Sequence, residues 1–191
     1  MKKITILLIT AMFTLATSAF AGGMIGVKYG TGDLEGTSKK YTAGTNTYAA
    51  QTKSKENEFG AIFAEINIME SPISLGLEYV PFEAAISIDG HTDNASANVS
   101  DYTTVYALAM KELNKVGVYA KLGYSMADIG TIKNNDATTT AITAASSSLE
   151  GIMYGVGVQS KELPFGLVAR AEYTFTEFDD ISITTTSNGS P

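Results

Sequence analysis

Apolar and polar side chains alternate along residues 165–178, which read FGLVARAEYTFTEF. The odd positions from 165 to 175 are apolar, whereas the even positions in between include Arg170 and Glu172, with Val168 as the exception. A period of two residues predicts a β-strand, because successive side chains of a strand point to opposite faces. About ten residues is also the length that a tilted strand needs to cross the hydrocarbon core of a bilayer. The pattern therefore predicts a membrane-spanning strand.

The same alternation recurs in six further segments, which are residues 22–30, 58–69, 73–82, 101–111, 116–126 and 149–160. Long polar inserts and short connections alternate between these segments along the chain. Antiparallel strands that cross a membrane would place every long insert on one side and every tight turn on the other. A soluble β-sandwich has no reason to follow this rule. The spacing therefore favours a transmembrane barrel.

The two faces of the predicted strands differ in a way that suits a narrow tube. One face carries Ile, Val, Leu, Tyr and Phe, and the other is mostly Gly, Ala, Ser and Thr with isolated charges. Three cations and three anions balance there, as a poorly hydrated interior requires, because an unpaired buried charge is costly. We expect these six residues to form a structural ion network inside the barrel that also fixes strand register: Lys28, Glu65, Glu78, Lys121, Arg170 and Glu172.

Six tyrosines share the apolar face, where they are predicted to form an aromatic girdle at the membrane interfaces: Tyr29, Tyr79, Tyr106, Tyr124, Tyr154 and Tyr173. The competing interpretation turns this face inward and makes the tyrosines the core of a secreted soluble domain. The two interpretations differ in whether Leu122 and Val156 meet lipid or a central cavity.

Residues 1–21 have the composition of a secretory signal peptide. Lys2 and Lys3 precede an apolar run that starts at Ile4, and Ala19 and Ala21 are the small residues of a cleavage site. The run is shorter than the ~20 residues of a spanning helix, which argues against an uncleaved anchor. The net charge of −7 argues against nucleic acid, and the absence of cysteine leaves stability to packing and hydrogen bonding.

Together with the strands of the FGLVARAEY type, these features resemble the small eight-stranded outer-membrane β-barrels of the OmpA/OmpX-like group. The resemblance implies an all-β, antiparallel up-and-down transmembrane barrel over residues 22–191. Members close with an even number of strands and end in a strand with a terminal aromatic, whereas this chain shows seven and ends in the polar stretch 179–191. We therefore expect a domain truncated at its C-terminus, with the first and seventh strands as unpaired edges.

The resemblance also implies a bacterial outer-membrane, cell-envelope protein of porin-like architecture, with a structural or adhesin-like surface role and a packed interior rather than a wide pore. The expected partners are outer-membrane lipid, the barrel-assembly machinery and a surface ligand bound by the long loops, with no nucleic acid and a monomeric state. We expect no catalytic, cofactor-binding or metal-binding residues. The alternatives are an outer-membrane lipid-modifying enzyme, which would use His91, Asp93 and a loop serine, and a soluble periplasmic lipocalin-like binder.

Overall fold

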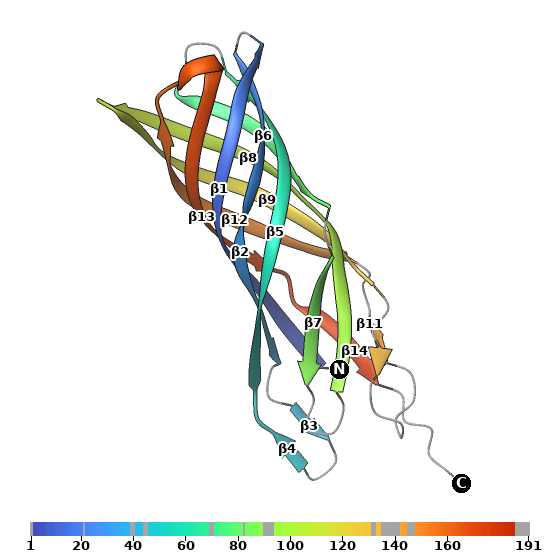
Figure 1. Cartoon of the computed structure of the whole chain (residues 1–191). Coiled ribbons are helices and arrows are strands. Elements are labelled where there is room, and N and C mark those ends of the chain that lie inside the picture. Colours follow the sequence, from blue (N-terminus) through green and yellow to red (C-terminus); the bar gives the residue numbers. More distant parts are fainter. Residues whose placement is uncertain are drawn as a thin grey trace.

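A closed antiparallel barrel of eight strands forms the body of this computed structural model (Figure 1). The structure describes residues 2–20, 22–38, 41–43, 46–68, 71–81, 83–89, 94–130, 133–134, 142–144 and 148–185. Its wall consists of β1 (Lys2–Phe20), β2 (Gly23–Ser38), β5 (Gln51–Asn67), β6 (Ile73–Val80), β8 (Asn94–Leu113), β9 (Val116–Ile129), β12 (Ser148–Ser160) and β13 (Leu167–Phe178). These strands pair in this order, and β1 closes the circle by pairing with both β13 and β2.

The long inserts gather at one end of the barrel, which we call the loop end (Figure 1). They contain the short strands β3 (Tyr41–Ala43), β4 (Asn46–Tyr48), β7 (Ala84–Asp89), β10 (Lys133–Asn134), β11 (Ile142–Ala144) and β14 (Ile181–Thr185). The short connections lie at the opposite end, the turn end, where Asn114 adopts a positive φ of 32° in the tight turn between β8 and β9. The structure thus has the predicted alternation of long and short connections.

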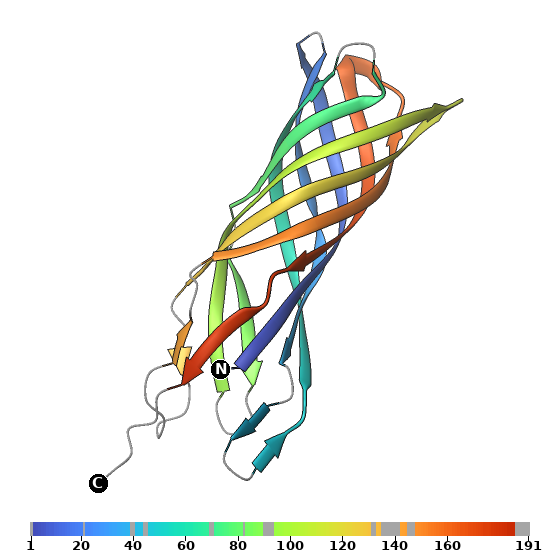
Figure 2. The ribbon, with the colours of Figure 1, turned by 180° about the vertical axis from the view of Figure 1, so that it is seen from behind.

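Residues 2–20 form a strand, and this changes the predicted strand count. The seven strands predicted from the sequence are present, but β1 pairs with β2 from Ile4↔Ser38 to Phe20↔Gly23 and with β13 along its other edge. Seen from behind in Figure 2, β14 continues past the end of β13 beside the start of β1. The expectation of seven strands with two unpaired edges is therefore wrong for this structure, because the alternating segment predicted to be a leader fills the gap.

Several wall strands extend further toward the loop end than predicted. Strand β2 continues to Ser38, and β5 already begins at Gln51, within the predicted polar insert 31–57. Thr37 and Thr52 join side chains across this extension, with Oγ1 atoms 3.0 Å apart. Backbone pairing needs no apolar alternation once the strands leave lipid. The alternation of apolar residues therefore does not predict these extensions.

The last connection at the turn end differs from the prediction. Pro164–Gly166 forms a 3-10 turn, in which Phe165 has φ +69° and is 97% exposed, and β13 begins only at Leu167. The predicted strand 165–178 therefore starts two residues too early. Proline at the start of the segment fixes its own φ and cannot donate to a ladder, which favours a turn there.

The two faces of the wall separate as the membrane interpretation requires. The outward side chains of Leu122 and Val156 are 57% and 60% exposed, whereas Lys121 and Arg170 are buried inside. Outward apolar side chains cover every one of the long strands after Gly22. No helix among the described residues is long and apolar enough to span a membrane.

The interior itself is divided. Toward the loop end it is filled by an apolar cluster that includes Leu8, Leu34, Phe59, Val99 and Phe178. The charged residues occupy the part next to this cluster, where Tyr106, Leu108, Tyr119 and Met153 form a second, smaller apolar group. The candidate site is this charged region together with the wall around it.

Candidate functional site

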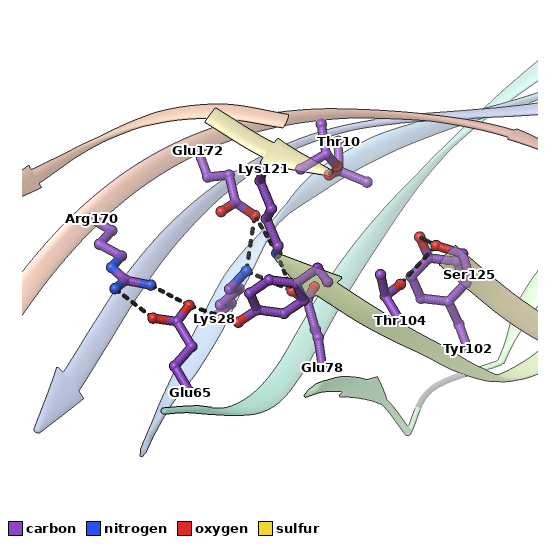
Figure 3. Close-up of polar contacts among 12 residues, drawn as sticks. Thr10, Lys28, Glu65, Glu78, Tyr102, Thr104, Lys121, Ser125, Arg170 and Glu172 are labelled. Atoms are coloured by element: carbon purple, nitrogen blue, oxygen red, sulfur yellow. Dashed lines mark hydrogen bonds and ion pairs between the residues drawn. The ribbon is translucent and has the colours of Figure 1, made fainter. Parts of the chain in front are cut away.

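Four of the six predicted charges form a closed ring of ion pairs across the lumen (Figure 3). Lys28 Nζ lies 2.6 Å from Glu78 Oε2 and 2.8 Å from Glu172 Oε1. Lys121 Nζ lies 2.8 Å from the same Glu78 oxygen and 3.2 Å from the same Glu172 oxygen. Each cation therefore contacts both anions, and each anion contacts both cations.

The strand order explains why this ring spans the barrel. Lys28 on β2 and Lys121 on β9 come from opposite sides of the wall, with three strands between them. Glu78 on β6 and Glu172 on β13 are opposite each other in the same way. Charges of alternating sign thus meet from four quarters of the wall, and the ring closes the cross-section with no net charge.

The remaining two charges form a separate pair beside the ring (Figure 3). Arg170 donates from Nη1 to Glu65 Oε1 at 2.6 Å and from Nη2 to Glu65 Oε2 at 2.7 Å. Its Nε donates to Gln159 Oε1 at 2.6 Å, and Tyr106 Oη donates to Glu65 Oε1 at 2.7 Å. Two parallel bonds between a guanidinium and a carboxylate fix orientation as well as charge, so this pair is held rigidly.

Tyr106 and Tyr119 donate hydrogen bonds to charged residues inside the barrel, and the sequence pattern predicted Tyr106 on the outer face instead. Tyr106 is 2% exposed and lies inside, with its ring centroid 3.7 Å from Lys121 Nζ, so its assignment to the outer girdle is wrong. Asp101 has φ +52°, and the β8–β9 register shifts between Ser100 and Thr103. Beyond this shift Val105 faces outward and Tyr106 inward, which reverses the predicted faces of β8.

The other five predicted girdle tyrosines, Tyr29, Tyr79, Tyr124, Tyr154 and Tyr173, are exposed or half-buried on the outside of the wall. Three of them donate hydrogen bonds to carboxylates on a neighbouring strand. These bonds join Tyr29 to Glu58 at 3.0 Å, Tyr79 to Asp101 at 2.7 Å, and Tyr124 to Glu150 at 2.5 Å. The strand pairs are β2–β5, β6–β8 and β9–β12, which are the pairs that the three long inserts connect. We call these bonds the tyrosine clasps.

Comparison with known families agrees with this geometry. The family model described as outer membrane protein beta-barrel domain matches residues 4–189, which is nearly the whole chain. The chain belongs to this outer-membrane β-barrel family. A search of curated protein sequences found no match.

The structure of this outer-membrane barrel contains interior residues that the sequence reasoning missed. Tyr119 donates to Glu172 Oε2 at 3.0 Å, and Gln159 is the partner of Arg170. Glycines on the neighbouring strands are the signal that these tyrosines face inward, since Tyr106 pairs directly with Gly76, and Tyr119 with Gly157. A glycine opposite a large aromatic residue leaves room for its ring on a crowded inner face.

The described residues contain no site that supports the lipid-modifying enzyme or the lipocalin-like binder. His91 and Asp93, the candidate residues of a lipid-modifying enzyme, lie outside the part of the chain that the structure describes. Within the described part, no group of three or more His, Asp or Glu side chains is placed to hold a metal ion. The belt of exposed apolar side chains argues against a soluble lipocalin-like protein, which would keep such a face inside.

Proposed function

We propose that this outer-membrane barrel protein has a structural or adhesin-like surface role, with a packed interior instead of a wide diffusion pore. The ring of Lys28, Glu78, Lys121 and Glu172 carries the proposal. It crosses the lumen from four sides, and its side chains are at most 8% exposed. An eight-stranded barrel has an interior that side chains can just fill, and here paired charges and tyrosines fill it.

The surface role is supported by the loop end. The extended β2–β5 pair, the β3–β4 hairpin and the β7–β8 pair carry ordered backbone well past the ring (Figure 1). Exposed, ordered loop structure on a rigid scaffold is where binding residues concentrate. The closed interior and the built-up loop end together favour contact with partners outside the cell over transport through the barrel.

Two measurements test this proposal. Purified protein in planar lipid bilayers should show no steady conductance above that of the empty bilayer, and a stable open channel would contradict the packed interior. Cells that display the protein should aggregate or attach to glass more than cells displaying a variant with Tyr41–Tyr48 replaced by a short Gly-Ser linker. Equal attachment, with equal amounts of protein at the surface, would contradict the adhesin-like role of the β3–β4 hairpin.

We also infer export by the leader-like residues 1–21, and this has a structural consequence. Cleavage after Ala21 would remove β1 and leave the edges of β2 and β13 unpaired, so the wall would need another strand running from the loop end to the turn end. The intact mass of protein purified from the outer membrane tests the inference. We expect the mass of a chain that begins at Gly22, and a mass that retains Lys2 and Lys3 would refute cleavage.

A further inference from the structure

The turn between β12 and β13 holds an aromatic side chain that projects away from the rest of the protein. Phe165 is 97% exposed and stands at the tip of the turn Pro164–Gly166. Its backbone has φ +69°, in the left-handed region, which is an outlier for a bulky residue. Neither the exposed ring nor the strained backbone contributes to the packing of the barrel. The reason for a phenylalanine at this position is therefore to be sought outside the chain.

The base of this turn is closed, so the ring is held away from the wall. Leu163 and Leu167 form a β-bridge, in which the Leu163 N–H donates to the Leu167 carbonyl at 2.7 Å. Below the bridge, the Ala169 N–H donates to Ser160 Oγ at 3.0 Å. These bonds tie both ends of the turn to each other. Phe165 is thus presented on a short loop of defined shape.

Apolar side chains of the outer face continue to the turn end of the barrel, where the short connections lie (Figure 1). Leu113 and Val116 are the last residue of β8 and the first of β9, and both are exposed. Ile73, the first residue of β6, is exposed as well. Lys111 also faces outward there, and a lysine can extend its ammonium group from an apolar surface to the lipid headgroups. The hydrocarbon layer therefore ends close to the turns themselves.

The distance from this edge to the tip matches the thickness of the headgroup layer. Phe165 lies two residues before Leu167, the first residue of β13, and two strand residues span about 7 Å. The headgroup layer on each side of a bilayer is about 5–7 Å thick. Apolar side chains that bind at this boundary reach about 5–10 Å into it. The Phe165 ring is therefore within reach of the upper part of the acyl chains.

Continuity with the outer face identifies lipid as the partner of this ring. Leu163 is exposed and carries the apolar surface from the wall to the turn. Lys161 and Glu162 precede it, and both are exposed. Their charges cancel, so the turn is not repelled by either zwitterionic or anionic headgroups.

We propose that Phe165 is a membrane anchor, whose ring inserts between the headgroups and the acyl chains of the phospholipid leaflet at the turn end. The proposal requires the barrel to lie in a bilayer, which its family supports, and it does not depend on the surface role proposed above. A negative result in the adhesion assay therefore leaves it standing. It is also independent of β1, because the turn connects β12 and β13.

A single-tryptophan variant tests the depth of the turn in the full chain, because the sequence contains no tryptophan. Phe165→Trp is folded into phosphatidylcholine vesicles in which part of the lipid carries bromine on the chain segment near the headgroup. The bromine should quench the fluorescence of this variant several-fold more than that of Ser54→Trp, the control on the exposed loop-end extension. Acrylamide in the water should show the opposite order. Equal quenching of the two variants by either quencher would overturn the proposal.

The native ring gives a second test, which does not depend on the indole and also applies should Phe165→Trp fail to fold. In phosphatidylcholine nanodiscs, the ring signals of Phe165 are identified by their loss in Phe165→Leu. These ring protons should give nuclear Overhauser contacts to lipid chain protons. Contacts to water alone would refute insertion, and they would leave the turn free to meet a protein partner in the aqueous phase.

Discussion

Tyr106 lies directly opposite Gly76, and its ring occupies the place where a side chain at position 76 would stand. A methyl group there would collide with the ring carbons and the hydroxyl of Tyr106. That hydroxyl is bonded to Glu65, so the ring is not free to move aside. The glycine is therefore needed for the charge network to form.

Gly76→Ala should lower the free energy of unfolding by about 1–3 kcal/mol, the usual cost of overpacking a filled interior. Urea titration of the barrel in lipid vesicles, followed by the electrophoretic shift that folded barrels show on heating, measures the change. Gly36→Ala is the matched control, because nothing lies within 4 Å of a methyl group at that position. Similar losses in both variants would show that strand glycines are sensitive for a reason other than the tyrosine.

Arg170→Leu should be strongly destabilising, because it leaves the Glu65 carboxylate buried without its cation. Loss of one partner of a buried pair typically costs about 3–5 kcal/mol. The double variant Arg170→Leu with Glu65→Leu removes both charges and should recover much of the loss. Urea midpoints of the three proteins test this, and a double variant as unstable as the single one would contradict the pairing.

Val156→Arg should impair folding into lipid vesicles, because its side chain is 60% exposed on the apolar outer belt. A cationic side chain near the middle of the bilayer costs about 2–4 kcal/mol on a barrel surface. Ser54→Arg places the same charge on the exposed loop-end extension and should have little effect. The fraction that shows the heat-dependent electrophoretic shift gives the comparison, and equal folding of both variants would be evidence against the membrane belt.

Ala11→Pro tests β1 as a wall strand. Ala11 pairs with Thr31 on one side and Tyr173 on the other, and proline would remove a ladder donor from the middle of a closed sheet. The full chain, refolded in vitro so that no leader is removed, should then lose stability in urea. Ala120→Pro in β9, which is also paired on both edges, should give a comparable loss. If only Ala120→Pro destabilises the barrel, β1 is not needed for closure.

The fold was readable from the sequence where lipid and interior impose opposite demands on alternate residues. The segment 116–126 shows this, since Leu122 faces out and Lys121 faces in, as the pattern predicts. The prediction of strand bounds and faces failed where lipid and interior do not impose opposite requirements on alternate residues. The extensions of β2 and β5 lie beyond the apolar belt. Tyr106 is amphipathic enough for either face, so the pattern alone does not fix its orientation.

The charge network was predictable as a set of residues but not as an arrangement. Counting inward charges identified all six residues, because each lies on the face of its strand opposite the row of apolar side chains. Their division into a ring of four and the separate Arg170–Glu65 pair depends on which strands are opposite each other in the closed barrel. Which strands are opposite each other depends on the wall having eight strands. Residues 2–20 form the eighth, but the sequence predicted them to be a leader.

The tyrosine clasps have a consequence for how this scaffold can change. Each clasp ties together the two strands that one long insert connects, so the spacing at the base of every insert is set by the wall and not by the insert. An insert can then be lengthened, shortened or exchanged while its two attachment points stay in place. The three inserts can therefore vary independently of one another. New recognition surfaces can arise on them without changes to the strands that lie in the membrane.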